Sequence, residues 1–566
     1  MTRAGLALLA LLALLAGAIY ASLPPRGVAL SVPNDAAASG VRGAMHVHTR
    51  RSDGTGTVEE IAAAAARAGL TFVVLTDHAD ASRERDRPVY ISGVLCIDAV
   101  EISTDGGHVV ALGMARSPYP LGGEARDVVD DVARLGGMSI AAHPGSAKPE
   151  LRWVEWAAPF DGLEWLNGDS EWRDESPVAL ARAVLTYPFR RAETLASTLD
   201  RPGAIMQRWD VLTARRKVVA VAAADAHAKL PLRGGGDEYD SVGILQVPAY
   251  EQVFRTFSIT LPDVSLGGDA AADATLVIDA IRRGHVYSSI DAMAAPAVLR
   301  FSATRAGVSV GAGDVLPTAP GDVALAIESN APDNARIVLI KNGLATSVAG
   351  PSHMEIVPGA ERAAYRVEIQ LPAGPGEPPV PWIVSNPVYI GNPAEGTVAP
   401  LRPATEFAPQ YENGFATDWT VHSSPRSRAA LDVVPALGGT QLSMRWALGG
   451  TRAESPYAAL VMPAGPAFSG YDRLMFTASA SVPMRISVQI RIPGGVDGER
   501  WHRSVYLDQE ARDVTVFFDD MRPKGPTTQR RPVLANVQDV MFVVDTVNTK
   551  PGAAGQIWID DVKYGR

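Results

Sequence analysis

An almost unbroken run of apolar residues opens the chain, from residue 4 to residue 21, and Pro24-Pro25 closes it. The run is short for a bilayer-spanning helix and long for the apolar part of a signal peptide. We therefore expect residues 1–24 to be a cleaved signal peptide or an N-terminal membrane anchor. The rest of the protein should be exported, either free in a bacterial periplasm or anchored to the outer face of the inner membrane.

The pattern then changes from a strand to a helix and back to a strand between residues 42 and 78. A capping box at Thr57 and Glu60 predicts the helix, and Gly69 is placed to end it. The strands on either side end in polar motifs, which are His46-Val47-His48, followed by Ser52-Asp53-Gly54, and Asp77-His78. Side chains two apart on a strand share a face, so His46 and His48 should lie side by side. The βαβ pattern predicts that both motifs meet at one edge of a parallel sheet.

Apolar strands that end in ligand-type side chains recur further along the chain. Glu101 lies in a strand-like segment, and His108 follows closely enough for the two to belong to a hairpin. Residues 138–142 and 218–224 form apolar strands that end in His143-Pro144 and Asp225-Ala226-His227. Helical periodicity is expected over residues 127–135, 177–199, 204–216 and 273–283, and a glycine-rich loop over residues 233–237.

From residue 296 the pattern becomes one of short strands separated by Gly, Pro and Asn turns. Asn342-Gly343 is a strong hairpin signal. We predict a small β-sandwich over residues 296–395, a proline-containing linker, and a second β domain over residues 410–566. In this last domain residues 484–492 alternate strictly between apolar and polar side chains, which predicts a half-buried strand.

Composition limits the partners. The formal net charge of -10 over 566 residues argues against a nucleic-acid backbone as a partner. The single cysteine, Cys96, cannot form an intramolecular disulfide and lies in an apolar run, which indicates a buried small residue. Stability must therefore come from packed cores and bound metal.

The histidines are distributed unevenly. Six of the ten fall between residues 46 and 227, and each of these six lies at a strand end or in a motif. Together with three acids they form the candidate metal ligands, which are His46, His48, Asp53, His78, Glu101, His108, His143, Asp225 and His227.

The motif His46-x-His48-Thr49-x-x-Ser52-Asp53-Gly54, followed by Thr76-Asp77-His78, resembles the opening signature of the PHP (polymerase and histidinol phosphatase) superfamily. The resemblance implies an α/β fold, a distorted (β/α)7 barrel over residues 42–295, followed here by two all-β sandwich domains. It implies two or three divalent metal ions, and the mixed oxygen and imidazole ligands suit Zn, Mn or Fe. The order of the motifs is similar to that of exported metallohydrolases grouped with carbaryl hydrolase.

The resemblance also assigns the ligands to three sites. His46, His48, Glu101 and Asp225 correspond to the first, with Glu101 as the bridging carboxylate. Glu101 and His143 correspond to the second, with His108 as an additional ligand. Asp53, His78 and His227 correspond to the third, where some relatives carry histidine in place of Asp53.

This ligand set implies hydrolysis of a small-molecule substrate by a metal-bridging hydroxide, without a Ser-His-Asp set. Asp77 would orient a ligand or accept a proton, and Arg50, Arg51 and Lys229 would grip an anionic group, unless these cations are only solvated. We favour phosphoesters as substrates, with a carbamate or carboxyl ester as the alternative. A rival class is a non-catalytic protein that binds a glycan or envelope partner, because the C-terminal domain resembles galactose-binding-like and carbohydrate-binding jelly rolls.

Overall fold

The computed structural model describes residues 3–32, 40–229, 246–372, 374–393, 402–411, 418–436, 438–494 and 498–566. The start of the N-terminal segment, the glycine-rich stretch 233–237 and the first part of the linker lie outside the described residues. The chain divides into two compact units, which are described separately. The first unit comprises Met1–Ala79, Glu84–Ala115 and Val128–Thr397, and the second comprises Asp80–Arg83, Arg116–Asp127 and Val398–Arg566.

The first unit begins with helix α1 (Arg3–Ser22). Within the described part of the chain, no helix has the combination of length and apolar character that crossing a membrane requires. The assignment of residues 1–24 as a signal peptide or anchor stays a prediction.

The predicted βαβ unit is present. Strand β2 (Val41–Val47) pairs in parallel with β3 (Phe72–Leu75), and helix α2 (Val58–Arg67) connects them. Both hydrogen bonds of the predicted capping box form: Glu60 N–H donates to Thr57 Oγ1 at 3.2 Å, and Thr57 N–H donates to Glu60 Oε2 at 2.9 Å. Gly69 follows the helix with a φ of +75°, as a helix-ending glycine should.

Two sheets carry the strands that lead to the candidate ligands. The five-stranded sheet has the order β10-β9-β8-β7-β6, and the larger sheet contains the run β12-β11-β2-β3-β5-β4. Isolated parallel bridges from Val47 to Ala226 and from His78 to Glu101 join the ends of strands in the two sheets. The remaining strands of these runs are β4 (Val89–Ile91), β5 (Val94–Asp98), β6 (Val100–Thr104), β7 (Gly107–Leu112), β8 (Met138–Ala141), β9 (Gly162–Asn167), β10 (Val219–Ala223), β11 (Ser258–Leu261) and β12 (Tyr287–Ser289).

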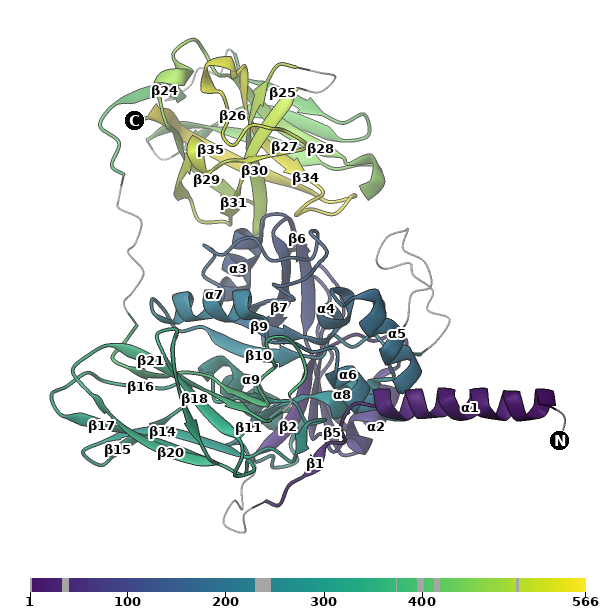
Figure 1. Ribbon diagram of the computed structural model, residues 1–566. Helices are drawn as coiled ribbons and strands as arrows, with labels where there is room; N and C mark the ends of the chain where they lie inside the picture. The colour runs from purple at the N-terminus through teal and green to yellow at the C-terminus, as the bar shows by residue number, and fades with distance from the viewer. Residues whose placement is uncertain are drawn as a thin grey trace. The chain divides into compact units, whose positions relative to one another are not determined.

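Helices accompany these strands. Helices α5, α6 and α8 lie beside one another in Figure 1. Residues 177–199 were predicted as one helical stretch, but they form two helices, α5 and α6. The helices after α2 are α3 (Ala125–Arg134), α4 (Gly168–Arg173), α5 (Pro177–Thr186), α6 (Arg191–Ala196), α7 (Gly203–Thr213), α8 (Tyr250–Thr256) and α9 (Ala270–Arg283).

The predicted β-sandwich after residue 295 shares a sheet with the strands before it. Strand β22 pairs with β12, so one sheet of twelve strands runs through both regions, and the four-stranded sheet β15-β14-β17-β20 packs with part of it around an apolar core. The predicted hairpin turn joins β18 and β19, with φ of +50° at Asn342 and +86° at Gly343. The strands of this region are β14 (Leu299–Arg305), β15 (Val308–Gly311), β16 (Val315–Leu316), β17 (Asp322–Ser329), β18 (Arg336–Lys341), β19 (Leu344–Ala349), β20 (Ser352–Pro358), β21 (Ala363–Gln370), β22 (Ile383–Ser385) and β23 (Val388–Ile390). A two-stranded sheet joins β1 (Val28–Ala29) to β13 (Ala294–Ala295).

The second unit is a β-sandwich of two six-stranded sheets with a continuous apolar core. Its strands are β24 (Phe407–Tyr411), β25 (Thr420–Ser423), β26 (Arg428–Ala436), β27 (Gly439–Ala447), β28 (Tyr457–Pro463), β29 (Arg473–Ala480), β30 (Met484–Ile492), β31 (Glu499–Leu507), β32 (Arg512–Phe517), β33 (Arg522–Pro523), β34 (Asp539–Asp545) and β35 (Ala554–Gly565), with short 3-10 helices at Arg452–Glu454, Phe468–Gly470, Phe518–Asp520 and Leu534–Asn536.

One prediction for this sandwich was wrong in part. Strand β30 alternates as expected, but its polar residues Arg485 and Gln489 are buried with the apolar ones. The Arg485 guanidinium lies 3.3 Å from the Asp127 carboxylate, in the stretch Arg116–Asp127 that belongs to this unit. The second face of the strand is therefore covered by a segment from far earlier in the chain.

Candidate metal centre

The nine candidate ligands converge at the ends of strands β2, β3, β6, β7, β8 and β10. They form four overlapping groups in which the ligand atoms lie within 4.8 Å of one another. The groups are His48-Asp53-His78-His227, His46-His143-Asp225, His46-His48-Glu101 and His78-Glu101-His108. Residues up to 181 positions apart in the chain therefore meet in one buried cluster.

The backbone is irregular where it delivers three of these ligands. His46, His143 and Asp225 have φ of +62°, +30° and +45°, in the left-handed region that side chains other than glycine rarely adopt. Each such residue costs on the order of 1–3 kcal/mol, which the surrounding structure must offset. The pairing of β2 with β3 also shifts between Ala44 and Val47. His46 and His48 lie close, with ring centroids 5.1 Å apart, but through this irregularity and not through regular strand alternation.

Glu101 lies at the centre of the cluster and is 1% exposed. Five imidazoles surround its carboxylate. The distances from ring nitrogen to carboxylate oxygen are 3.0 Å for His46, 3.3 Å for His48, 3.3 Å for His78, 2.8 Å for His108 and 2.8 Å for His143. A carboxylate shared in this way has the position expected of a bridging ligand.

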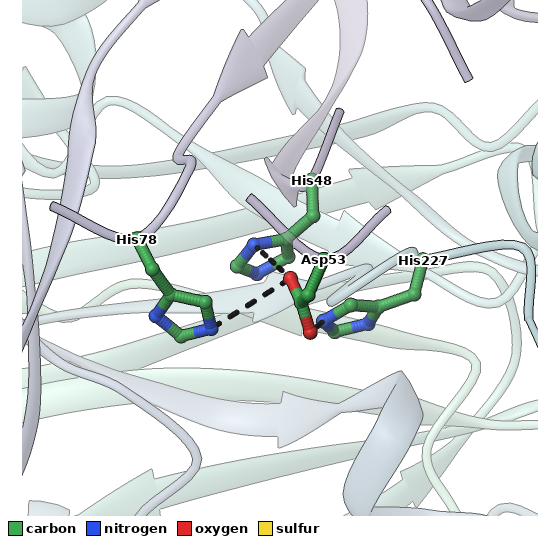
Figure 2. Close-up of side chains that lie close together, drawn as sticks. All are labelled: His48, Asp53, His78 and His227. Carbon is green, nitrogen blue, oxygen red and sulfur yellow. Dashed lines mark ion pairs between the residues drawn. The ribbon is translucent and has the colours of Figure 1, made fainter. Parts of the chain in front are cut away.

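Asp53 is the centre of a second group. Figure 2 shows its carboxylate between the rings of His48, His78 and His227, which approach from three directions. The shortest approach is from His227 Nε2 to Asp53 Oδ2, at 3.0 Å, and Lys229 Nζ lies 3.0 Å from the same oxygen. His48 therefore belongs to both groups, which the sequence did not indicate.

Three of the histidines have their Nδ1 atoms held by oxygen atoms that are not candidate ligand atoms. His143 Nδ1 lies 3.0 Å from Leu151 O, and His227 Nδ1 lies 2.9 Å from Asp225 O. A carbonyl oxygen can only accept, so in both rings Nδ1 carries a proton and Nε2 is the nitrogen that faces the cluster. His46 Nδ1 donates to Glu164 Oε1 at 2.5 Å, with the same consequence. This is the arrangement in which metal-binding histidines are usually held.

Sequence reasoning did not identify the role of Glu164. Its side chain is fully buried in β9 and accepts three hydrogen bonds, from His46 Nδ1, from His143 N–H at 2.7 Å and from Asn167 Nδ2 at 2.8 Å. The available signal was an acidic residue inside the otherwise apolar run Gly162-Leu163-Glu164-Trp165-Leu166. Glu164 positions two candidate ligands at once.

The charges of the cluster suit a cation. His48 Nε2 is buried without a hydrogen-bond partner, although Glu101 and Asp225 oxygens each lie 3.3 Å away. Burial opposes the charged form of His48, but these two carboxylates outweigh it and raise its pKa to about 10. Burial likewise opposes the charged forms of Glu101 and Asp225, yet the surrounding imidazoles hold the pKa of both carboxyl groups well below the usual range. Protons on histidines thus balance the buried carboxylates, and divalent cations would take over that role.

The pKa values of the histidines differ strongly within this small volume. Burial lowers the pKa of His78 to about 3, with the neighbouring His48 adding to the effect. Burial also opposes the charged form of His143, but its hydrogen bond to Glu101 raises the pKa to about 9. At neutral pH His78 is therefore already in the neutral form that binds metal, whereas His143 must release a proton.

The side chains proposed to assist catalysis or bind substrate differ in what they contact. Asp77 accepts from Thr49 N–H and Thr49 Oγ1, both at 2.8 Å, and from Ser52 Oγ at 2.7 Å, so it fixes the turn that carries His48 and Asp53. Arg51 pairs with Asp98 at 3.1 Å and with Asp86 at 2.5 Å, and Arg50 pairs with Glu60 at 3.2 Å on the surface. Of the three cations considered, Lys229 is the one that faces the candidate ligands.

Tyr250 of α8 holds the turn from the other side. Its hydroxyl donates to His48 O at 2.8 Å and accepts from the N–H groups of Thr55 and Gly56, both at 3.1 Å. Gly54 lies in the same turn, where a Cβ atom would come within 2.2 Å of His48 O. The turn is therefore closely packed around the ligands.

A cavity of about 450 Å³ adjoins the cluster. Asp225, His227 and Lys229 are part of its lining. The rest of its wall comes from α4, α5, α6 and α8 and is largely apolar, including Trp172, Leu180, Ala183, Val184, Tyr187, Leu195, Leu199, Val253 and Phe257. Its volume lies within the range of roughly 300–1,000 Å³ typical of small-molecule sites.

No family model matches the chain, and no curated protein matches it. Among solved structures, the chain is similar to the family 11 carbohydrate-binding module of a cellulosomal cellulase from Clostridium thermocellum, with 16% identity and a TM-score of 0.25 over 29% of this chain and 97% of that one. It is also similar to the family 30 module of another C. thermocellum cellulosomal cellulase, with 9% identity and a TM-score of 0.21 over 28% of this chain and 96% of that one. A carbohydrate-binding module of the β-sandwich superfamily gives 11% identity and a TM-score of 0.21 over 48% of this chain and 99% of that one. Similarity at this level assigns neither a family nor a ligand to the chain.

Proposed function

We propose that the protein is an exported metal-dependent hydrolase of the PHP type, with phosphoesters as the favoured substrates. The observation that carries this proposal is the convergence of six histidines and three acids, with the Nδ1 atoms of three histidines held by oxygen acceptors so that Nε2 faces the cluster. The bridges that join the ends of the two sheets support a distorted (β/α)7 barrel.

The groups of ligand atoms support part of the assignment of ligands to sites. His46, His48, Glu101 and Asp225 would hold the first ion, Glu101, His108 and His143 the second, and Asp53, His78 and His227 the third. The groups differ from this assignment in two ways. His143 is grouped with His46 and Asp225, and His48 and His78 each belong to groups of two different sites, so either could complete a neighbouring site.

Divalent ions bound here would activate water and polarise the bond to be cut. Side chains of the protein would position the ligands and bind the substrate. Glu164 would accept the hydrogen bond from His46 Nδ1 and so leave Nε2 as the nitrogen that faces an ion, and Asp77 would hold the turn that carries Asp53. Lys229, with its side chain 10% exposed, would draw an anionic substrate group toward Asp53 and His227.

A carbamate or carboxyl ester is the second candidate substrate, and the apolar cavity beside His227 favours it. A neutral ester needs less positive charge at the site than a phosphate does. The third group of ligands, Asp53, His78 and His227, distinguishes the two possibilities because its ion would neutralise the additional charge of a phosphate.

The double variant Asp53→Ala with His78→Ala tests this choice. It should abolish turnover of phosphomonoesters and phosphodiesters while the remaining ions stay bound. The matched control is Asp314→Ala with His285→Ala, which removes an aspartate–histidine pair at 2.9 Å outside the cluster and should leave turnover unchanged. A parent protein without phosphatase activity, together with unchanged hydrolysis of a neutral ester by the double variant, would contradict the phosphoester assignment.

A glycan or envelope partner for the second unit stays a prediction. Among the described residues of that unit, Phe407 is the one large aromatic side chain that is exposed, at 49%. Sugar rings commonly stack on exposed aromatic side chains, so this surface offers little support for a glycan site. Retention of the full chain on insoluble polysaccharides would support a glycan partner, and elution in the void fraction from all of them would contradict it.

A further inference from the structure

The cavity beside the candidate metal centre has features that the hydrolase proposal does not use. Its lining includes Asp225, His227 and Lys229 together with residues of helices α5, α6 and α8. We propose that this cavity binds the apolar chain of an amphipathic substrate whose ester or phosphoester group reaches the metal centre. This inference rests on the proposed function and specifies its substrate class.

Several polar atoms of the cavity wall already have hydrogen-bond partners within the protein. Thr194 Oγ1 donates to Thr186 Oγ1 at 3.1 Å, and Thr198 Oγ1 donates to Leu195 O at 2.8 Å. Trp172 Nε1 donates to Asp169 Oδ1 at 3.0 Å. Little hydrogen-bonding capacity remains for a polar group such as a sugar or a base, whose buried polar atoms would be left unpaired.

Asp169 does not add an unpaired negative charge to the wall. Its carboxylate is paired with the Arg173 guanidinium at 2.6 Å, four residues away on α4. The lining therefore combines Lys229 and the candidate ligands Asp225 and His227 with a set of mostly apolar side chains. A molecule with a charged head and an apolar chain matches this combination.

Apolar side chains continue from the cavity to the surface along α5. Val184 lines the cavity and is 72% exposed, so it lies at the opening. Val178, Leu185 and Phe189 on or next to the same helix are exposed by 80%, 52% and 62%. Apolar residues grouped at an opening usually mark a binding surface, and a chain longer than the cavity would continue onto them.

The test is calorimetric binding to the full, metal-loaded protein with two series of probes. The first is the non-hydrolysable n-alkylphosphonates from methyl to octyl, and the second is the n-alkyl alcohols of the same lengths. Affinity should rise about fourfold with each added methylene until the cavity is filled, as expected for burial of apolar surface. No turnover is needed for this readout.

Two substitutions on α5 provide the structural control. Ala183 lines the cavity, whereas Ala181 is exposed and does not. Ala183→Trp should fill the cavity and reduce the ratio of octyl to methyl affinity at least tenfold. Ala181→Trp adds the same side chain to the same helix and should keep that ratio.

The outcomes separate this inference from the function on which it rests. Equal affinity for short and long chains in both series would overturn the cavity assignment. An equal fall in the ratio of octyl to methyl affinity in Ala183→Trp and Ala181→Trp would overturn it as well. A chain-length dependence in both series with no advantage of phosphonates over alcohols would support the cavity and contradict the phosphoester function. Displacement of octylphosphonate by vesicles of phosphatidic acid, but not of phosphatidylcholine, would identify a bilayer lipid as the source of the chain. Displacement by neither would identify a dissolved amphiphile.

Discussion

The substitution Glu164→Gln tests the arrangement of the metal ligands with little change in shape. Glu164 Oε2 accepts two hydrogen bonds, from His143 N–H and from Asn167 Nδ2, whereas Oε1 accepts one, from His46 Nδ1. Asn167 cannot reverse its amide without loss, because its Oδ1 accepts from Ser170 N–H at 3.0 Å. A glutamine should therefore turn its oxygen toward the two donors and its NH₂ toward His46.

That orientation changes the histidine. An NH₂ group facing Nδ1 favours the tautomer in which Nδ1 accepts and Nε2 carries the proton, and this tautomer cannot bind metal. To bind an ion, His46 must place two donors against each other in a buried site, at a cost of about 1–3 kcal/mol. Metal affinity should therefore fall roughly 5- to 150-fold, which includes the 10- to 100-fold range typical for partners of metal ligands.

The assay is competition for metal with a chromophoric chelator, at pH 7. The control is Glu171→Gln, which replaces a buried carboxyl in the adjacent helix α4 that accepts from Asp200 N–H and touches no candidate ligand. A Glu164→Gln protein that binds metal within twofold of the parent would contradict this role of Glu164. So would a Glu171→Gln protein whose metal binding is weakened as much as that of Glu164→Gln.

Three further predictions concern other parts of the first unit. Burial raises the pKa of Glu171 to about 8, so its contribution to stability is full below pH 4 and is lost as pH rises to 8. Glu171→Gln should therefore stabilise the protein by on the order of 5 kcal/mol at pH 9 and not at pH 4, as measured by urea unfolding. Gly54→Ala should displace His48 O, which should lower the free energy of unfolding by about 1–3 kcal/mol and weaken metal binding. Gly203→Ala, where the nearest neighbouring atom to the added Cβ is 3.9 Å away, should change neither quantity. Thermal unfolding and elemental analysis measure the two effects. Lys229→Met should raise KM for a phosphomonoester about tenfold and leave KM for a neutral ester unchanged, and equal effects on both would contradict its role.

Local features of the sequence predicted the positions of most elements. The capping box at Thr57 and the turn at Asn342-Gly343 act over a few residues, so the sequence alone was sufficient to locate them. Each strand end that supplies a ligand could be recognised because an apolar run stops at a histidine or an acid. The nine candidate ligands were therefore singled out before their proximity was known.

Features that depend on distant partners were not predictable in this way. Glu164 is a single acid in an apolar strand, and its partner His46 lies 118 positions earlier. Arg485 reads as a solvent-facing residue until Asp127, hundreds of positions earlier, is placed against it. The pairing of β22 with β12 likewise depends on backbone hydrogen bonds, which leave no pattern in the side chains.

Cation placement also required the structure. From the sequence alone, an anionic substrate group could be bound by any of Arg50, Arg51 and Lys229, because all three lie near the ligand motifs. The structure separates them because Arg51 is surrounded by acids, with Asp86, Asp98 and Asp77 all within 4.0 Å, whereas Lys229 lies against Asp53.

The central claim is that these residues hold catalytic metal, and reconstitution tests it most directly. Protein stripped with a chelator should hydrolyse no phosphoester. On titration with Zn, Mn or Fe, the rate should rise and level off at two or three ions per chain. A rate that is unaffected by stripping, or a stripped protein that takes up less than one ion per chain at saturation, would contradict the account.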